Sequence, residues 1–180
     1  MSDIAANFAQ VQERIAAGCA AVDRDAEEVS LLAVSKYSPA DAVRAALAIG
    51  HQAFGESRVQ DLAAKAKELR AESQLQWHLI GSLQTNKVRD LVQVDRVALL
   101  HSLDRKKLAG QLQRELVAAG KTLDVLLQVN ATGEESKHGC LPDAVSDLLE
   151  YVQTNCGALR VQGMMAMGPL QGSARAVFDR

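Results

Sequence analysis

The sequence has few cysteines, and none lies in a pattern that builds a disulfide framework or a zinc site. Cys19, Cys140 and Cys156 are an odd number, lie far apart and form no Cys-x-x-Cys pair. Disulfide-rich secreted domains and structural zinc sites both depend on paired cysteines. The absence of such pairs favours a reducing compartment, and we expect a cytoplasmic protein.

Long apolar runs, a secretory leader and an excess of one charge are also absent. No apolar stretch approaches the length of a membrane span, which needs about eighteen residues or more. The amino-terminal segment lacks the charged-then-apolar order of a signal peptide. The formal net charge is −2, with Lys and Arg scattered along the chain, so there is no basic stripe for nucleic acid and no polybasic membrane patch. We therefore expect a small-molecule ligand, with neither nucleic acid nor membrane as a partner.

The composition is that of one globular domain. The chain has 180 residues, of which 48% are hydrophobic and 23% charged. A chain of this size buries a sizeable core without needing a second domain. We expect a single domain over residues 1–180.

Strand-like apolar runs alternate with helical segments six times along the chain. The expected strands are 29–36, 52–55, 76–80, 97–101, 123–130 and 159–166, and the expected helices are 39–49, 58–71, 85–94, 104–120, 142–155 and 172–180. An extra amphipathic helix precedes them, and the apolar residues on its one face are Ile4, Phe8, Val11 and Ile15. Gly50 and Gly120 mark two helix ends, and Ser57 with Gln60 matches a capping box at a helix start.

Six βα units fit two architectures. One is a doubly wound open sheet, and the other is part of an eight-unit barrel, which normally spans roughly 250 residues. No Gly-x-Gly-x-x-Gly turn follows the first expected strand, and the run from Gly81 to Lys87 lacks the second glycine of a phosphate loop. These absences argue against a nucleotide site, but the alternation alone leaves sheet and barrel open.

Lys36 ends the first expected strand, directly before the helix-start signal from Ser38 to Asp41. In a parallel α/β protein, the carboxyl ends of the strands are where ligands bind. A neutral amine held there can form a Schiff base with an aldehyde. The position of Lys36 therefore suggests an aldehyde cofactor.

Several short motifs occur in the order and spacing of a known family. They are Leu31-Leu-Ala-Val-Ser-Lys36, Phe54-Gly-Glu56, Trp77-His-Leu-Ile-Gly81, Leu83-Gln84, Asn86-Lys87 and Gly163-Met164-Met165. With these motifs the chain resembles the pyridoxal phosphate homeostasis protein family over essentially its whole length. The resemblance implies a fold-type III barrel like the barrel domain of alanine racemase, in which the lysine of the first strand forms an internal aldimine with pyridoxal 5'-phosphate (PLP). Lys36 occupies that position.

The resemblance points to three further residues near the cofactor, each with a structural alternative. His78 lines the cofactor pocket or is a hydrogen-bonded core residue. Met165, at the carboxyl end of the sixth expected strand, contacts the cofactor ring or fills the core. Ser57 stands where the family commonly has an asparagine near the cofactor, so the chain departs from the pattern there, and its alternative role is to cap the following helix.

Length is the largest departure from the family, because a closed barrel needs two more βα units than this chain has. In the family, the absent part contains the Ser- and Gly-rich turns that hold the cofactor phosphate and an arginine near the pyridine nitrogen. No residue of this chain matches those roles. An apparently truncated barrel leaves its first and last strands as unpaired edges. We therefore expect weaker cofactor retention and a tendency to self-associate.

The resemblance implies a PLP-binding protein of vitamin B6 homeostasis, with no established catalytic turnover and with recipient apo-enzymes as unidentified partners. Two alternatives remain open at this point. The first is a PLP-dependent racemase or decarboxylase of the same fold type, although those enzymes have a second domain for which this chain has no room. The second is a cofactor-free Schiff-base lyase or aldolase, in which Lys36 attacks a substrate carbonyl directly.

Overall fold

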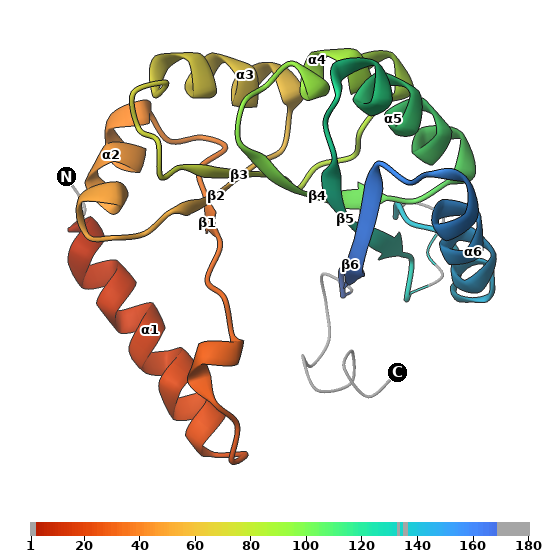
Figure 1. The fold of residues 1–180 in the computed structure, drawn as a ribbon. Helices are drawn as coiled ribbons and strands as arrows, with labels where there is room; N and C mark the ends of the chain where they lie inside the picture. Colours follow the sequence, from red (N-terminus) through yellow and green to blue (C-terminus); the bar gives the residue numbers. More distant parts are fainter. Residues whose placement is uncertain (1–2, 133, 135–136, 169–180) are drawn as a thin grey trace.

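The chain forms one six-stranded parallel sheet whose strands lie side by side in the order in which they occur in the sequence. The computed structural model describes residues 3–132, 134 and 137–168. A helical segment follows each of the first five strands and returns the chain for the next parallel strand (Figure 1). The expected helix over 172–180 lies outside the described residues.

The strand and helix bounds follow the expected alternation closely. The strands are β1 (Ala33–Val34), β2 (Ala53–Glu56), β3 (Gln76–Leu79), β4 (Val97–Leu103), β5 (Leu123–Val129) and β6 (Leu159–Ala166). The helices are α1 (Ile4–Ala20), α2 (Ala40–Ala48), α3 (Val59–Glu68), α4 (Val88–Val92), α5 (Lys106–Ala119) and α6 (Val145–Asn155). Short 3-10 turns add η1 (Ala26–Glu28), η2 (Thr85–Lys87) and η3 (Pro142–Ala144). Gly50 and Gly120 follow α2 and α5 with φ of 89° and 63°, a left-handed backbone that glycine adopts without strain.

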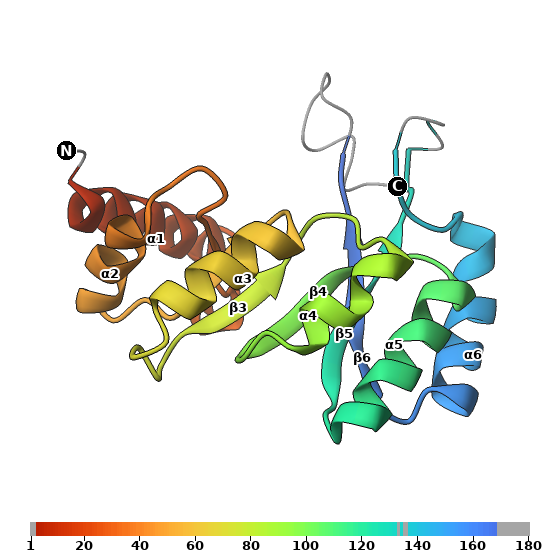
Figure 2. The ribbon, with the colours of Figure 1, turned by 90° about the horizontal axis from the view of Figure 1, so that it is seen from above.

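The sheet has a covered face and an open face. Helices α2 to α6 form an arc along the covered face (Figure 1), and a second view shows the same layering from above (Figure 2). Phe54, Trp77 and Leu79 point into this layer and are at most 2% exposed. Their alternate neighbours in each strand point the other way, because successive side chains of a strand lie on opposite faces. We call the face opposite the helices the inner face.

The strand order decides between the two architectures that the sequence left open. A doubly wound sheet reverses its strand order at a switch point, whereas a barrel adds each new strand beside the last. The order β1 to β6 without reversal is that of a barrel. Among the described residues β1 and β6 are the two outer strands and do not pair with each other, so the sheet is an open part of a barrel.

β1 is shorter than the expected strand over 29–36. It is an edge strand that pairs only with β2, through Ala33 with Phe54 and Val34 with Gly55. Since β2 begins at Ala53, earlier residues have little partner strand beside them. Residues 29–32 therefore belong to no strand, and residues 26–28 before them form η1, where the Asp25 carboxylate accepts a hydrogen bond from the Glu27 N–H.

The expected capping box at Ser57 is wrong. The N-cap of α3 is Arg58, and no side chain provides a cap hydrogen bond there. Pairing with β3 continues to the end of β2, where the Ile80 N–H donates to the Glu56 carbonyl. The chain therefore stays extended up to Ser57, and the helix starts one residue later than a Ser57 cap requires.

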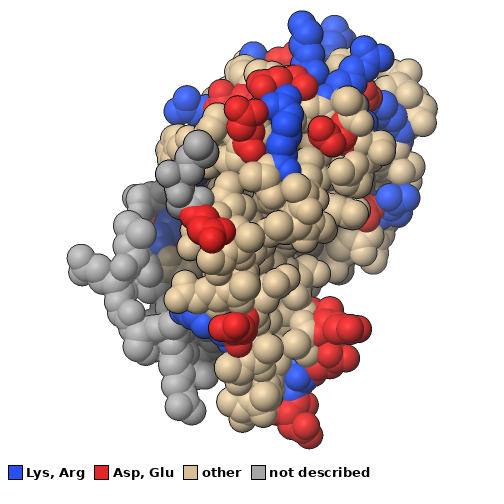
Figure 3. All heavy atoms as spheres, turned by 90° about the vertical axis from the view of Figure 1, so that its left-hand side faces the viewer, with Lys and Arg blue, Asp and Glu red and all other residues tan. Residues whose placement is uncertain are grey.

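Charge on the surface is mixed, as the composition suggested. On the face that Figure 3 shows, Lys and Arg side chains are interspersed with Asp and Glu side chains. Helix α1 packs against α2, and its Ile4 and Phe8 side chains extend the hydrophobic core at that end of the molecule. In the part of the chain that the structure describes, no helix combines the length and hydropathy needed to cross a membrane.

Candidate functional site

The strand register places the predicted site residues on one face of the sheet. Val34 pairs with Gly55, and Gly55 pairs with His78, so these positions form one row across the inner face. Lys36 and Ser57 each lie two residues further along, beyond the carboxyl ends of β1 and β2. This is the edge at which parallel α/β proteins bind ligands. Lys36, Ser57 and His78 thus come from three adjacent strands or the segments directly after them.

Lys36 is exposed, in the turn that leads from β1 to α2. Its Nζ lies 5.3 Å from the centroid of the Tyr37 ring, which is itself 92% exposed. This is a cation–π geometry, and at an exposed site such a contact contributes about 0.5–1 kcal/mol. The amine is therefore accessible from solvent and makes no ion pair among the described residues.

The residue before Lys36, Ser35, belongs to a buried polar cluster. Lys65 Nζ, from α3, donates to the Ser35 carbonyl at 2.5 Å and to Glu56 Oε1 at 2.5 Å. The Ser35 hydroxyl donates to the same carboxylate oxygen at 2.7 Å. Glu56 is fully buried and the Lys65 side chain is 14% exposed. We call Ser35, Glu56 and Lys65 the Lys65 cluster.

His78 is hydrogen-bonded to a second histidine on the inner face. Its Nδ1 lies 2.9 Å from Nε2 of His101 in β4, so one ring nitrogen donates its proton to the lone pair of the other. Burial, and secondarily the nearby His101, lowers the pKa of His78 from 6.5 to about 4. Burial also lowers the pKa of His101. Both rings are therefore neutral near pH 7.

Met165 lies at the other side of the sheet. It is in β6, where it pairs with Gln128 of β5. Leu127, which belongs to the helix-side core, pairs with Met164, so Met165 lies on the inner face with Lys36 and His78. Strands β2 to β5 lie between β1 and β6 in the sheet, so Met165 and Lys36 come from its two outer strands.

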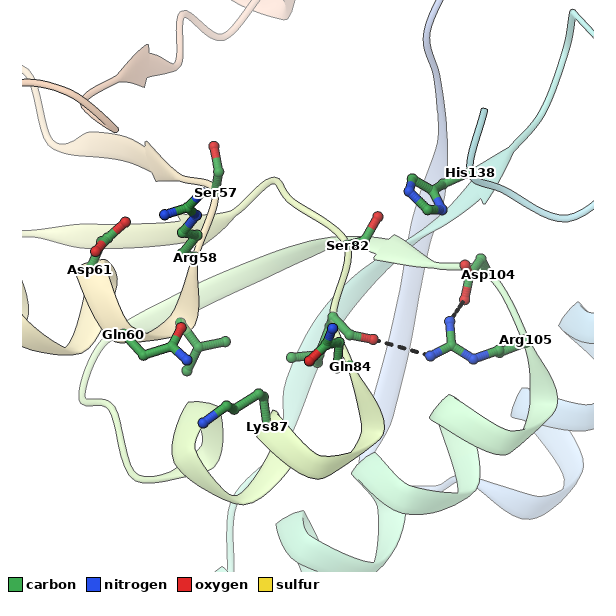
Figure 4. A pocket seen from close by; sticks show the side chains of 12 residues that line it. Ser57, Arg58, Gln60, Asp61, Ser82, Gln84, Lys87, Asp104, Arg105 and His138 are labelled. Carbon is green, nitrogen blue, oxygen red and sulfur yellow. Dashed lines mark hydrogen bonds and ion pairs between the residues drawn. The ribbon is translucent and has the colours of Figure 1, made fainter. Parts of the chain in front are cut away.

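A polar cavity of about 730 Å³ opens at the same edge of the sheet. Ser57, Arg58 and Asp61 lie on one side of it, and Asp104, Arg105 and His138 lie on the other (Figure 4). Arg105 pairs with Asp104 and donates to the Leu83 carbonyl, which fixes that wall. The other residues that line the cavity are Val59, Gln60, Ser82, Leu83, Gln84 and Lys87. Lys36, His78 and Met165 do not line this cavity, so Ser57 alone links it to the predicted site.

The sequence did not single out three of the groups described above. His101 ends the expected strand 97–101, and strand parity was the available signal that it shares a face with His78. Glu56 stood in a quoted motif without an assigned role. Lys65 gave no signal, because a lysine on an amphipathic helix ordinarily points to solvent. The described residues contain no group of three or more His, Cys, Asp or Glu side chains arranged to bind a metal ion.

Comparison with protein families adds an independent observation. The family model described as the N-terminal domain of alanine racemase matches residues 2–176. A protein of Pseudomonas aeruginosa named pyridoxal phosphate homeostasis protein is 44% identical over 167 residues, which cover 93% of this chain and 71% of that protein. The chain thus spans about seven-tenths of the length of this relative.

Two solved structures are similar in both fold and sequence. A protein of unknown function from Bifidobacterium adolescentis has a TM-score of 0.89 and 31% identity, over 98% of this chain and 76% of the other. PipY of Synechococcus elongatus, solved with PLP bound, has a TM-score of 0.75 and 34% identity, over 92% of this chain and 74% of the other.

Proposed function

Because this chain belongs to the pyridoxal phosphate homeostasis protein family, we propose that it binds PLP and holds it as a Schiff base on Lys36. The observation that carries the proposal is the place of Lys36, an exposed amine at the carboxyl end of β1 and at the inner face of a barrel-type sheet. The PLP-bound structure of PipY, a relative of similar fold, supports the choice of aldehyde. Control of free PLP in vitamin B6 homeostasis is the role that follows.

The covalent step needs only an amine and an aldehyde. The neutral Lys36 amine attacks the aldehyde carbon, the carbon–nitrogen double bond forms, and the aldehyde oxygen leaves as water. PLP, when bound, supplies the aldehyde and an anionic phosphate. Ser57 lies two residues beyond Gly55, as Lys36 lies two residues beyond its partner Val34, and we assign the Ser57 hydroxyl a hydrogen bond to the ligand. The side chains of Met165 and His78 line the inner face of the sheet on which we place the ligand.

The residues present fit the aldehyde end of PLP better than its phosphate end. Lys36 is exposed to solvent, and Ser57 lies just beyond the carboxyl end of the next strand, β2. The cavity at the same edge has Arg58, Lys87 and Arg105 in its lining, but Lys36 does not border it. We therefore assign retention chiefly to the covalent bond, and we expect slower capture and faster loss of PLP than in a relative with a complete barrel.

We propose binding and storage rather than catalysis. The name of the Pseudomonas aeruginosa relative, pyridoxal phosphate homeostasis protein, supports this choice, because it describes a role in cofactor balance rather than a reaction. The cytoplasm is the proposed location, which the three free cysteines support. Recipient apo-enzymes are the proposed partners, because a storage protein acts by releasing its ligand to them.

Borohydride reduction after incubation with PLP tests the proposal. Hydride addition to the carbon–nitrogen double bond makes the link permanent, and peptide mass mapping then locates it. We expect a label on Lys36, no label at that peptide in Lys36→Ala, and full labelling of Lys36 in the control Lys87→Ala, which removes another lysine from the same edge. Equal labelling of many lysines, or none on Lys36, would contradict the proposal.

Two further measurements separate the proposed function from the two alternatives. A racemase exchanges the α-proton of an amino acid with solvent, and a decarboxylase releases the carboxylate as carbon dioxide and adds a solvent proton at the α-carbon. Deuterium incorporation at that carbon from heavy water, measured with PLP present, therefore distinguishes either enzyme from a storage protein. A cofactor-free lyase traps a sugar or keto acid on Lys36 in preference to PLP. We expect neither deuterium incorporation nor such trapping.

A further inference from the structure

The end of β1 is held by a helix side chain as well as by the sheet. The last backbone hydrogen bond between β1 and β2 runs from the Ser35 N–H to the Gly55 carbonyl at 2.9 Å. In a parallel ladder the Ser35 carbonyl accepts the next bond from the neighbouring strand. Here it accepts the Ser38 N–H at 2.9 Å, which closes the turn that contains Lys36, and it also accepts the Lys65 ammonium of α3, 30 residues along the chain. The residue immediately before Lys36 is thus attached to a helix on the far side of the sheet.

Lys65 and Glu56 bind the backbone carbonyl and the side-chain hydroxyl of Ser35, respectively. Its carbonyl accepts from Lys65 and its hydroxyl donates to Glu56 Oε1, while Lys65 and Glu56 also bind each other. With its backbone and side chain both engaged, Ser35 is 4% exposed. Lys36, the next residue, is exposed and has no such restraints. The direction in which the Lys36 side chain leaves the sheet is therefore set at Ser35.

Burial makes this arrangement rigid. A buried ion pair is costly to break, because removal of one partner leaves the other charge uncompensated away from water. Glu56 has no exposed surface, and its second oxygen, Oε2, is buried without a hydrogen-bond partner among the described residues. Among the described residues the carboxylate is therefore compensated by Lys65 and Ser35 alone, so the loss of either partner is costly.

We propose that Lys65, acting through Glu56 and Ser35, is the positioning residue for Lys36. The inference rests on the proposed function, because it assumes that Lys36 is the amine that reacts with PLP. The Lys65 cluster holds the root of the Lys36 side chain so that the amine projects from the inner face toward the ligand. Lys65 does not itself compete for the aldehyde, since its ammonium donates to two buried acceptors and is largely shielded from solvent.

The test measures the rate at which PLP becomes attached to Lys36 in the full chain. Borohydride trapping at successive times, followed by peptide mass mapping, gives the rate of labelling at each lysine. A loss of alignment of about 1 Å costs as much as a hundredfold in such reactions, and we expect Lys65→Met and Ser35→Ala to slow labelling of Lys36 by about tenfold. Lys65→Arg, which keeps charge and donors, is expected to restore most of the rate.

Two controls separate positioning from simple destabilisation. Lys67→Met removes an exposed lysine from the same helix and is expected to leave the rate unchanged. The circular dichroism of the PLP absorption band, scaled to the amount trapped on Lys36, reports how the bound ring is oriented. It is expected to shrink in Lys65→Met and Ser35→Ala, at a temperature where both are folded, and to return in Lys65→Arg. Ser35→Ala provides the result if Lys65→Met fails to fold.

The experiment gives different outcomes for the positioning role of Lys65 and for PLP binding by Lys36. If the unmodified chain carries label on Lys36 but Ser35→Ala and Lys65→Met react at the same rate with the same dichroism, the positioning role is overturned while the proposed function stands. If the unmodified chain carries no label on Lys36, both fall. Slower labelling with smaller dichroism, restored by arginine, supports both.

Discussion

At the scale of single residues, the paired histidines give the inner face a marked dependence on pH. The hydrogen bond between His78 Nδ1 and His101 Nε2 needs a lone pair on one ring, so two protonated rings cannot keep it. Burial in the folded chain also disfavours the charged form of each ring. Unfolding exposes both rings to water, where they take up protons more readily.

The sign of the effect on stability follows from these pKa values. The pKa of His78 is about 4 when folded and 6.5 in its ordinary environment, so the unfolded chain binds more protons between those values. Stability is therefore fully present above about pH 6.5 and is lost as the pH falls toward about 4. After a discount for partial exposure, we expect His78 to account for a loss of about 1 kcal/mol by about pH 5.

Urea denaturation near neutral pH and near pH 5 measures this loss. His78→Gln removes the titrating group, so its unfolding free energy is expected to fall less with pH than that of the unmodified chain. An equal fall in both proteins would show that other groups cause the acid sensitivity.

The sequence predicted the position of Lys36 after the first strand, but not the groups around it. Lys36 stands at the end of an apolar run and before a helix start, a pattern that needs no knowledge of distant residues. The partners of Ser35 come from β2 and α3, and the partner of His78 comes from β4. Such pairings depend on register and on helix docking, which local patterns do not encode. The cofactor roles of Lys36, Ser57, His78 and Met165 stay predictions.

At the scale of elements, the connection after β3 is held against the end of β2. The Ser102 hydroxyl donates to the Gly81 carbonyl at 2.7 Å, which fixes the chain just beyond β3. A Cβ atom on Gly81 would lie 2.0 Å from the Ser57 carbonyl oxygen and 2.8 Å from its carbonyl carbon. Both neighbours are backbone atoms, so neither moves aside as a flexible side chain does. Gly81 thus sets how closely Ser57 approaches the end of β3.

Gly81→Ala is therefore expected to destabilise the fold. Forced overpacking with a backbone shift typically costs about 1–3 kcal/mol, and we expect a value near the upper end. The control is Gly18→Ala in α1, where an added Cβ meets no atom within 4 Å. Alanine is favoured over glycine inside a helix, so that change is expected to raise stability by about 0.5–1 kcal/mol. Equal unfolding midpoints for the two variants in urea would contradict this account.

The expected bounds were most accurate for β6 and for α2. The expected strand 159–166 coincides with β6, and the expected helix 39–49 lies within one residue of α2 at each end. The largest error was β1, where an apolar run of eight expected residues yields a strand of two. Apolar character predicts that a segment is attracted to the core, whereas strand length depends on the length of the partner strand.

At the scale of the whole molecule, the described sheet has two unpaired edges. β1 and β6 lie at its ends, and each carries an exposed apolar side chain, Val34 at 51% and Met164 at 67%. Unpaired strands offer backbone donors and acceptors to another chain, and apolar side chains on them favour such contacts. The expected tendency to self-associate follows from this surface.

Sedimentation velocity over a range of concentrations measures this tendency. Met164→Lys places a charge on the β6 edge, and charged edge residues oppose pairing between sheets. Since burial of a side chain of this size contributes about 1.5–3 kcal/mol, we expect the dissociation constant to rise by about tenfold. Val117→Lys is the matched control, because Val117 is similarly exposed at 61% but lies on α5, away from either edge. An equal effect of both variants would exclude association through β6.

The sequential strand order also has a consequence for how the chain folds during synthesis. Each strand pairs only with the strand before it and the strand after it in the sequence. Every new strand therefore finds its template already formed by the part of the chain that left the ribosome earlier. The stretch of chain that must close between neighbouring strands is short, and the entropic cost of closing it rises only slowly with its length. The chain can thus assemble vectorially, one unit at a time, and β1 with its Lys36 turn is in place before the last strands have been translated.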